Sequence, residues 1–265
     1  MYLMLTDETN RQPSDDVKFF VYGGLALPIE AIEPLHRAIA KIRQDSGYLP
    51  GDEFKFDTRS RPENVSIETS GEAKRQVIQA CRNSNCVFFV HVILHKIIAK
   101  QDPVQQIQWA ADYVISRFNM LLGSKSDTGI CVIDNLPERG QFQYLTDKFQ
   151  HGLHLPDGDS LPLDRIRLYA ATTVGAGHVN SAMDIVLGAF RYCINNPKNP
   201  QAASEMLSNL VPMMWGRREN DVYHVLDRGL ILRPPIERIS NASFREEYKA
   251  LIDQINELLH VLQER

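Results

Sequence analysis

The chain has 265 residues, enough for one large domain or for one domain with an appendage. Its net charge is −4, from 29 basic and 33 acidic residues, so no overall attraction for nucleic acid or for an acidic membrane surface is expected. We expect neither a membrane span nor a secretory signal, and we expect a cytoplasmic location, because no apolar run approaches ~18 residues and no basic segment precedes an apolar one at the N-terminus.

The first third of the chain begins with two short apolar runs separated by a polar stretch, which indicates a hairpin. The first run ends in Thr6-Asp7-Glu8-Thr9-Asn10, which is typical of a strand entering a turn. Beyond Pro28, apolar residues recur at helical spacing. Strands are predicted at 2–5 and 19–27, helices at about 28–42 and at 71–83, and a polar loop at 57–70.

The middle of the chain alternates strand and helix patterns, which predicts an α/β fold with a mixed sheet covered by helices on both faces. Strands are predicted at 86–94, 130–133 and 165–170, and helices at 104–122, 142–149 and 179–193.

The composition changes after Asn195, where NNPKNP predicts a linker or turn. We therefore expect one domain over residues 1–195 and a mainly helical C-terminal appendage over residues 196–265. Within the appendage an apolar stripe over residues 244–262 predicts an amphipathic helix, which offers a surface for forming a homo-oligomer. The stripe consists of Phe244, Tyr248, Leu251, Ile255, Leu258 and Leu262.

Four acidic residues stand at strand ends or inside apolar stretches: Asp7, Glu53, Asp134 and Asp184. A carboxylate beside so much hydrocarbon needs a partner, because its burial alone is unfavourable by several kcal/mol or more. A divalent metal is one such partner, and four carboxylates brought together would suit a hard cation such as Mg²⁺. Asp7 and Asp134 follow strands, and functional groups in open α/β sheets gather beyond strand ends.

Each of these acids also has a purely structural interpretation. Asp7 could be a turn residue, because Asp is common in turns. Asp134 could simply end a strand, and Glu53 stands beside a lysine in DEFKF, as surface residues often do. Asp184 could form a salt bridge with Arg191 or with another arginine.

Histidines and a glycine-bearing loop form competing candidates. His151, His154, Asp157 and Asp159 fall within nine residues and could bind a metal, although a polar surface loop explains them better. His91 and His95 fit core or sheet-edge positions. The stretch 172–178 could place a phosphate at a helix N-terminus, and its last residue, His178, either lies near the acidic site or caps the helix.

The order of the short motifs resembles domain-of-unknown-function family 3800 over about residues 1–195. The motifs that carry the resemblance are LTDET from Leu5, FFVYGGLALP from Phe19, DEFKF from Asp52, ICVID from Ile130 and NSAMDIVLGAF from Asn180. Two positions depart from the pattern of the family. Thr9-Asn10 stand where Ser-Gly is usual, and Ser181 stands where Gln is usual.

The resemblance implies a ribonuclease H-like fold with Asp7, Glu53, Asp134 and Asp184 as ligands of Mg²⁺ or Mn²⁺. It implies hydrolysis of phosphodiester bonds in nucleic acid by two divalent ions roughly 3.5–4 Å apart, with Lys55 or nearby arginines contacting phosphate. An alternative is a non-catalytic binding or regulatory module that uses the same fold and oligomerises through its C-terminal helix. A hydrolase of small phosphoesters is a third possibility.

Overall fold

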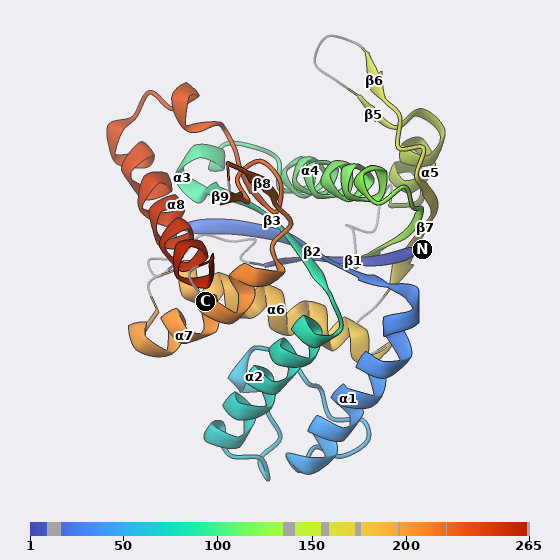
Figure 1. Cartoon of the computed structure of the whole chain (residues 1–265), viewed down its shortest axis with the longest axis vertical. Coiled ribbons are helices and arrows are strands. Elements are labelled where there is room, and N and C mark those ends of the chain that lie inside the picture. The colour runs from blue at the N-terminus through green and yellow to red at the C-terminus, as the bar shows by residue number, and fades with distance from the viewer. Residues whose placement is uncertain are drawn as a thin grey trace.

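A computed structural model describes residues 1–9, 17–134, 141–154, 159–172, 176–195, 197–220 and 222–263. Its centre is a six-stranded sheet in the order β10-β3-β2-β1-β4-β7 (Figure 1). β2 runs antiparallel to its neighbours β1 and β3, whereas β4, β7 and β10 join in parallel. This mixed sheet confirms the predicted α/β class. The strands are β1 (Tyr2–Thr9), β2 (Phe19–Pro28), β3 (Val87–Leu94), β4 (Gly129–Asp134), β7 (Ile166–Thr172) and β10 (Leu230–Leu232).

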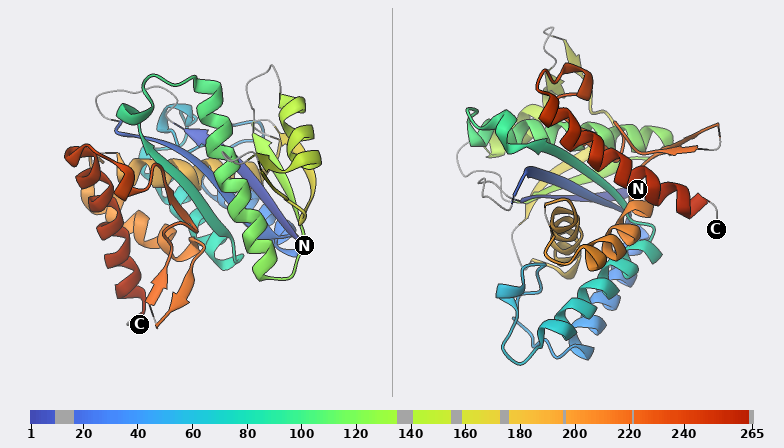
Figure 2. Two further views of the ribbon diagram at one scale, coloured as in Figure 1. Left: turned by 90° about the horizontal axis from the view of Figure 1, so that it is seen from above. Right: turned by 90° about the vertical axis from the view of Figure 1, so that its left-hand side faces the viewer.

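Helices cover both faces of the sheet (Figure 2). The right-hand view of Figure 2 shows α4, in green, above the sheet, and α6, α1 and α2 below it. Each layer buries its own apolar core against the sheet. The helices are α1 (Ile32–Asp45), α2 (Ile67–Asn83), α3 (His95–Ile98), α4 (Pro103–Ser124), α5 (Gln141–His151), α6 (His178–Ile194), α7 (Pro200–Leu210) and α8 (Ala242–Gln263), with short 3-10 turns η1 (Ile29–Ala31), η2 (Thr58–Ser60), η3 (Val211–Met213) and η4 (Ile236–Arg238).

A pair of glycines in β2 lets helices approach the sheet from both sides. A Cβ at Gly23 would lie 2.6 Å from Leu187 Cδ1 of α6, and a Cβ at Gly24 would lie 2.7 Å from Val114 Cγ1 of α4. A Cβ at either position would therefore require the facing side chain of the helix to shift.

The first strand is longer than its sequence indicates. Thr6–Asn10 were expected to form a turn, but β1 continues through Asp7 to Thr9, and Glu8 pairs with Tyr22 of β2. Backbone pairing with a long neighbouring strand outweighs the local turn preference of Asp and Thr. Asp7 is therefore held inside a strand.

The second helix also begins earlier than expected. The residues predicted as a loop at 57–70 include η2 and the first residues of α2, which begins at Ile67. Ser66 Oγ accepts a hydrogen bond from Thr69 N at 3.0 Å, so a serine cap starts the helix before its apolar face appears.

The segment expected to be a mainly helical appendage contributes directly to the sheet. Its strand β10 pairs in parallel with β3, at the edge of the six-stranded sheet. Three residues of the apolar stripe of α8 are buried within the same chain, since Tyr248 and Ile255 are 0% and Leu251 is 4% exposed. Three apolar residues are too few for a periodic pattern, so β10 was not visible in the sequence. Two small hairpins complete the fold: β5 (Leu153–His154) with β6 (Ser160–Leu161), and β8 (Arg217–Glu219) with β9 (Val222–His224).

Among the described residues, no helix combines the length and the apolar character that crossing a membrane requires.

Candidate functional site

A cavity of about 410 Å³ opens on the α6 face of the sheet, and all four candidate acids line it. They come from separate segments of the chain: Asp7 from β1, Glu53 from the extended stretch 52–56, Asp134 from the end of β4 and Asp184 from α6. Folding thus brings the acids that the sequence singled out to the wall of one cavity.

Two of the acids occupy neighbouring strands at equivalent positions. Thr6 of β1 pairs with Ile133 of β4, and Asp7 and Asp134 are the next residues in each strand. Asp7 shares its face of the strand with Leu5, which packs in the α6-side core, because side chains alternate along a strand. Asp7 Oδ1 also accepts a hydrogen bond of 2.7 Å from the backbone N–H that follows it.

Asp184 is held against the stretch that carries Glu53. Its Oδ2 accepts a 2.7 Å hydrogen bond from the backbone N–H of Phe56. Burial raises the pKa of Asp184, and the Phe56 N–H and the positive charges of Lys55, Arg191 and Lys74 act in the opposite direction. Ionisation of this carboxylate is therefore opposed by burial, and the nearby N–H and positive charges offset that cost only in part.

Gly188, one turn after Asp184, leaves the space that the Phe56 side chain occupies. A Cβ at Gly188 would overlap the Cβ and ring of Phe56. The space beside Asp184 is thus filled by an aromatic side chain. This packing brings the Phe56 N–H within reach of Asp184.

Two buried cations anchor the stretch 52–56 at its two ends. The guanidinium of Arg43 donates to the carbonyl oxygens of Leu49 at 3.2 Å and Asp52 at 2.7 Å, and Lys74 Nζ donates to the Phe56 carbonyl at 2.9 Å. Arg43 and Lys74 are 9% and 3% exposed. These residues position Glu53, because they fix the backbone on either side of it.

Sequence reasoning missed both anchors, although a signal was present. Arg43 lies four residues after Ile39 on the apolar side of α1, and Lys74 lies three residues before Val77 on the apolar side of α2. A long cation on an apolar helix face at i,i+3 or i,i+4 spacing indicates a buried role.

Glu53 itself points towards solvent and is paired. Its Oε2 lies 3.1 Å from Lys55 Nζ, and the side chains are 55% and 29% exposed. Glu53 and Lys55, two residues apart in an extended stretch, thus lie on one face of it. An ion pair so open to water contributes at most about 1 kcal/mol, so Glu53 can exchange its partner at little cost.

The donor set suits a hard cation, but the side chains do not form a metal centre as they stand. Carboxylate oxygens are the ligands that Mg²⁺ and Mn²⁺ prefer. Over the described ranges, however, no three His, Cys, Asp or Glu side chains gather closely enough to hold an ion. Binding a cation would therefore require Glu53, and the aspartates around it, to reorient into the cavity.

Two histidines complete the wall of the cavity. His36 of α1 and His178, the first residue of α6, have ring centroids 4.7 Å apart. Burial, with the positive charges of His36 and Arg43, lowers the pKa of His178. His178 therefore lies at the acidic site, which was one of its two expected places.

The competing candidates lie elsewhere. His151 Nδ1 and His154 Nε2 contact Asp147, at 3.0 and 3.2 Å. Asp159 is exposed, and Asp157 lies outside the described residues, as do residues 173–175 of the glycine-bearing loop. His91 is 4% exposed and His95 is 7% exposed, so both fit the expected core positions.

Comparison with known proteins adds no relative: no family model matches this sequence, and no curated protein matches it.

Proposed function

We propose that this protein is a divalent-metal-dependent nuclease of ribonuclease H-like fold, related to domain-of-unknown-function family 3800. Its reaction is hydrolysis of phosphodiester bonds in nucleic acid, with Mg²⁺ or Mn²⁺ as cofactor. The observation that carries the proposal is the single cavity lined by Asp7, Glu53, Asp134 and Asp184. Further support is the position of Asp7 and Asp134 on adjacent strands, with Asp184 on the helix that covers them.

Each acid has a distinct role in this proposal. Asp7 and Asp134 are the central ligands, because both belong to interior strands of the sheet. Asp184 is the ligand carried by the helix, and Glu53 is the mobile ligand at the mouth. Bound Mg²⁺ or Mn²⁺ would supply activation of water and neutralisation of charge at the scissile phosphate.

Lys55 connects cation binding with substrate binding. When Glu53 turns towards the cation, its pair with Lys55 is broken and the ammonium is left at the mouth of the cavity. A phosphate oxygen of the substrate then replaces the carboxylate as the partner of Lys55. Such a local positive charge is needed for binding, because the net charge of −4 provides no general attraction for nucleic acid.

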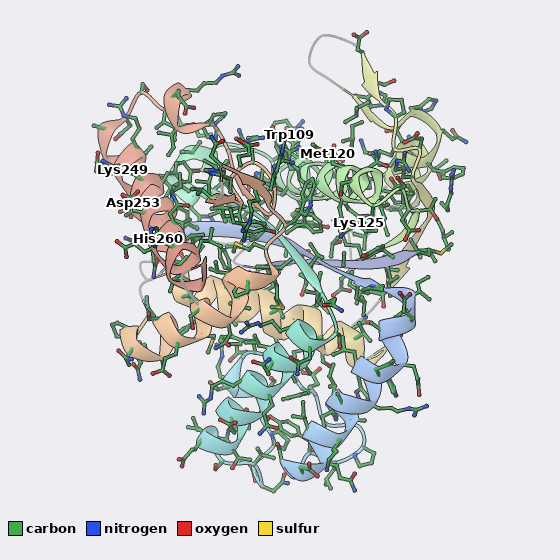
Figure 3. All side chains as sticks on the ribbon, viewed as in Figure 1. Trp109, Met120, Lys125, Lys249, Asp253 and His260 are labelled. Carbon is green, nitrogen blue, oxygen red and sulfur yellow. The ribbon has the colours of Figure 1, made fainter. Side chains whose placement is uncertain are left out.

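The direct test is cleavage of labelled DNA and RNA by the purified protein with Mg²⁺ or Mn²⁺. We expect Asp7→Asn and Asp134→Asn each to reduce the rate at least about 100-fold, because loss of a direct ligand should exceed the 10–100-fold effect of groups behind the ligands. A chelator should abolish the reaction. Asp253→Asn removes the same charge from an exposed site on α8 and should leave the rate unchanged (Figure 3).

If the two cavity variants cleave as fast as Asp253→Asn, the cavity is not the active site. Absence of cleavage by the unaltered protein on both substrates, with no binding of Mg²⁺ or Mn²⁺ by calorimetry, would reject the proposal as a whole.

A non-catalytic binding module is the second candidate, and two contacts favour it. The hydrogen bond of Asp184 to Phe56 and the ion pair of Glu53 with Lys55 give two of the four acids structural partners. The α8 stripe gives this alternative no support, because it packs within its own chain. Metal binding separates the two candidates, since a structural set of acids would not bind Mg²⁺.

A further inference from the structure

A second, larger cavity lies on the opposite, α4 side of the sheet. Its volume is about 720 Å³, within the range of roughly 300–1,000 Å³ that small-molecule sites occupy. Its wall is formed by β3, α3, α4, the β5–β6 hairpin and the segment after β10. None of its lining residues belongs to the carboxylate cavity, so this site is independent of the proposed nuclease activity.

Positive charge dominates the wall of this second cavity. Arg117 of α4 and Arg233 and Arg238 after β10 all line it. Arg233 pairs with Asp227 at 2.7 Å, whereas Arg117 donates to uncharged acceptors: the backbone carbonyl of Asp227 at 2.6 Å, Ser116 Oγ at 3.4 Å and Met120 Sδ at 3.8 Å. In the part of the chain that the structure describes, no carboxylate lies within ion-pair distance of Arg117 or Arg238.

The acidic residue that lines this cavity, Asp112, already has a lysine as its ion-pair partner. Its carboxylate lies 3.3 Å from Lys148 Nζ. Crowding of positive charge is also evident at Arg117, where burial and the neighbouring Arg233 and Arg228 lower the pKa of the guanidinium. Guanidinium groups held together in this way favour an anion, and their planar donors match phosphate oxygens.

Flat aromatic surfaces form another part of the wall. The ring of His91 stacks on Tyr113 with centroids 5.3 Å apart and planes 4° apart, and Arg233 lies 4.7 Å from the centre of the Tyr113 ring. Trp109, on α4 in Figure 3, is 45% exposed, and Leu161, which also lines the cavity, is 40% exposed. An exposed indole beside arginines offers a stacking surface for a planar ring.

We propose that this cavity binds a free nucleoside monophosphate. The arginines recognise the phosphate, and the indole of Trp109 stacks on the base. Both halves of the ligand are needed, because the phosphate alone would leave the apolar part of the cavity exposed to water and the base alone would leave the guanidinium charges without a partner. His91 contributes as an uncharged wall, since burial and Arg233 lower its pKa to about 3.

The test is titration of the full-length protein with AMP, adenosine and inorganic phosphate by calorimetry. We expect AMP to bind more tightly than either fragment. Arg238→Gln and Trp109→Ala should each weaken AMP binding about tenfold or more, through loss of a charged hydrogen bond and of base stacking. Both side chains are exposed, so the variants should fold.

Matched controls are available for both substitutions. Arg217→Gln alters an exposed arginine on β8, and Phe149→Ala truncates an aromatic side chain of α5 that is 63% exposed and lies outside the cavity. Both should bind AMP as the unaltered protein does. Asp7→Asn should also retain AMP binding, which separates this site from the carboxylate cavity.

Several results would overturn the proposal. Absence of AMP binding at millimolar concentration would do so, as would equal binding of AMP and adenosine, which would deny a role to the arginines. Binding that survives both Arg238→Gln and Trp109→Ala, or that is lost in Asp7→Asn, would place the nucleotide elsewhere.

Discussion

Asp184 is an acid of the carboxylate cavity whose pKa is changed by its burial. Burial raises its pKa above the usual value near ~3.9 for Asp, so ionisation disfavours the folded state. Its contribution to stability is therefore fully present below pH ~4 and is lost as the pH rises through its folded pKa. A cation in the cavity would compensate this loss, because it would favour the ionised form.

Asp184→Asn tests this account, because the amide oxygen can still accept from Phe56 while the charge is gone. Near pH 4 we expect its free energy of unfolding to match that of the unaltered protein, and at neutral pH to exceed it. Urea denaturation between pH 4 and 8 measures the difference. Mg²⁺ should stabilise the unaltered protein and not the variant. A difference that does not change with pH would contradict the assignment.

At the scale of the elements, the contact between α6 and the stretch 52–56 organises the carboxylate cavity. Gly188 of α6 leaves the space that Phe56 fills, and Phe56 in turn meets Asp184. Arg43 and Lys74 hold the same stretch from α1 and α2. The position of Glu53 therefore depends on three helices rather than on its own sequence.

Gly188→Ala should expose this dependence. The added methyl group would push Phe56 away, which should lower the free energy of unfolding by about 1–3 kcal/mol despite the better helix propensity of Ala. Cleavage by the proposed nuclease should fall with it. Gly71→Ala in α2 is the control, because its nearest heavy atom would be the Arg75 guanidinium at 4.0 Å. It should stabilise by up to about 1 kcal/mol, and equal effects of the two variants would contradict the packing argument.

At the scale of the molecule, the C-terminal segment is tied to the sheet by polar as well as apolar contacts. The hydroxyl of Tyr248, on α8, accepts from the backbone N–H of Leu94 at the end of β3, at 3.1 Å. It also donates to the carbonyl of Arg233 after β10, at 2.8 Å. One buried side chain thus connects the last helix with the end of β3 and with the wall of the second cavity.

Tyr248→Phe should destabilise the whole chain. It keeps the ring but leaves two backbone groups without their partner, which costs about 1–3 kcal/mol. Chemical denaturation measures the change. In Tyr192→Phe the lost hydroxyl accepts only from the exposed Asn199 N–H, so we expect a change within about 0.5 kcal/mol. If Tyr248→Phe is as mild, α8 is held by its apolar face alone.

The sequence by itself determined the features that repeat over short distances. Alternating apolar runs and helical spacing predicted the α/β class, and the cost of burying charge singled out the four acids that line the cavity. The tertiary structure decided everything that depends on partners far along the chain: the extension of β1 through Asp7, the short strand β10 and the anchoring of residues 52–56 by Arg43 and Lys74. The physical reason is the distance along the chain over which each feature is determined. Periodicity depends on residues that are close together in one helix or strand. A three-residue strand or a buried cation, in contrast, is stabilised only by the surface that folding brings against it.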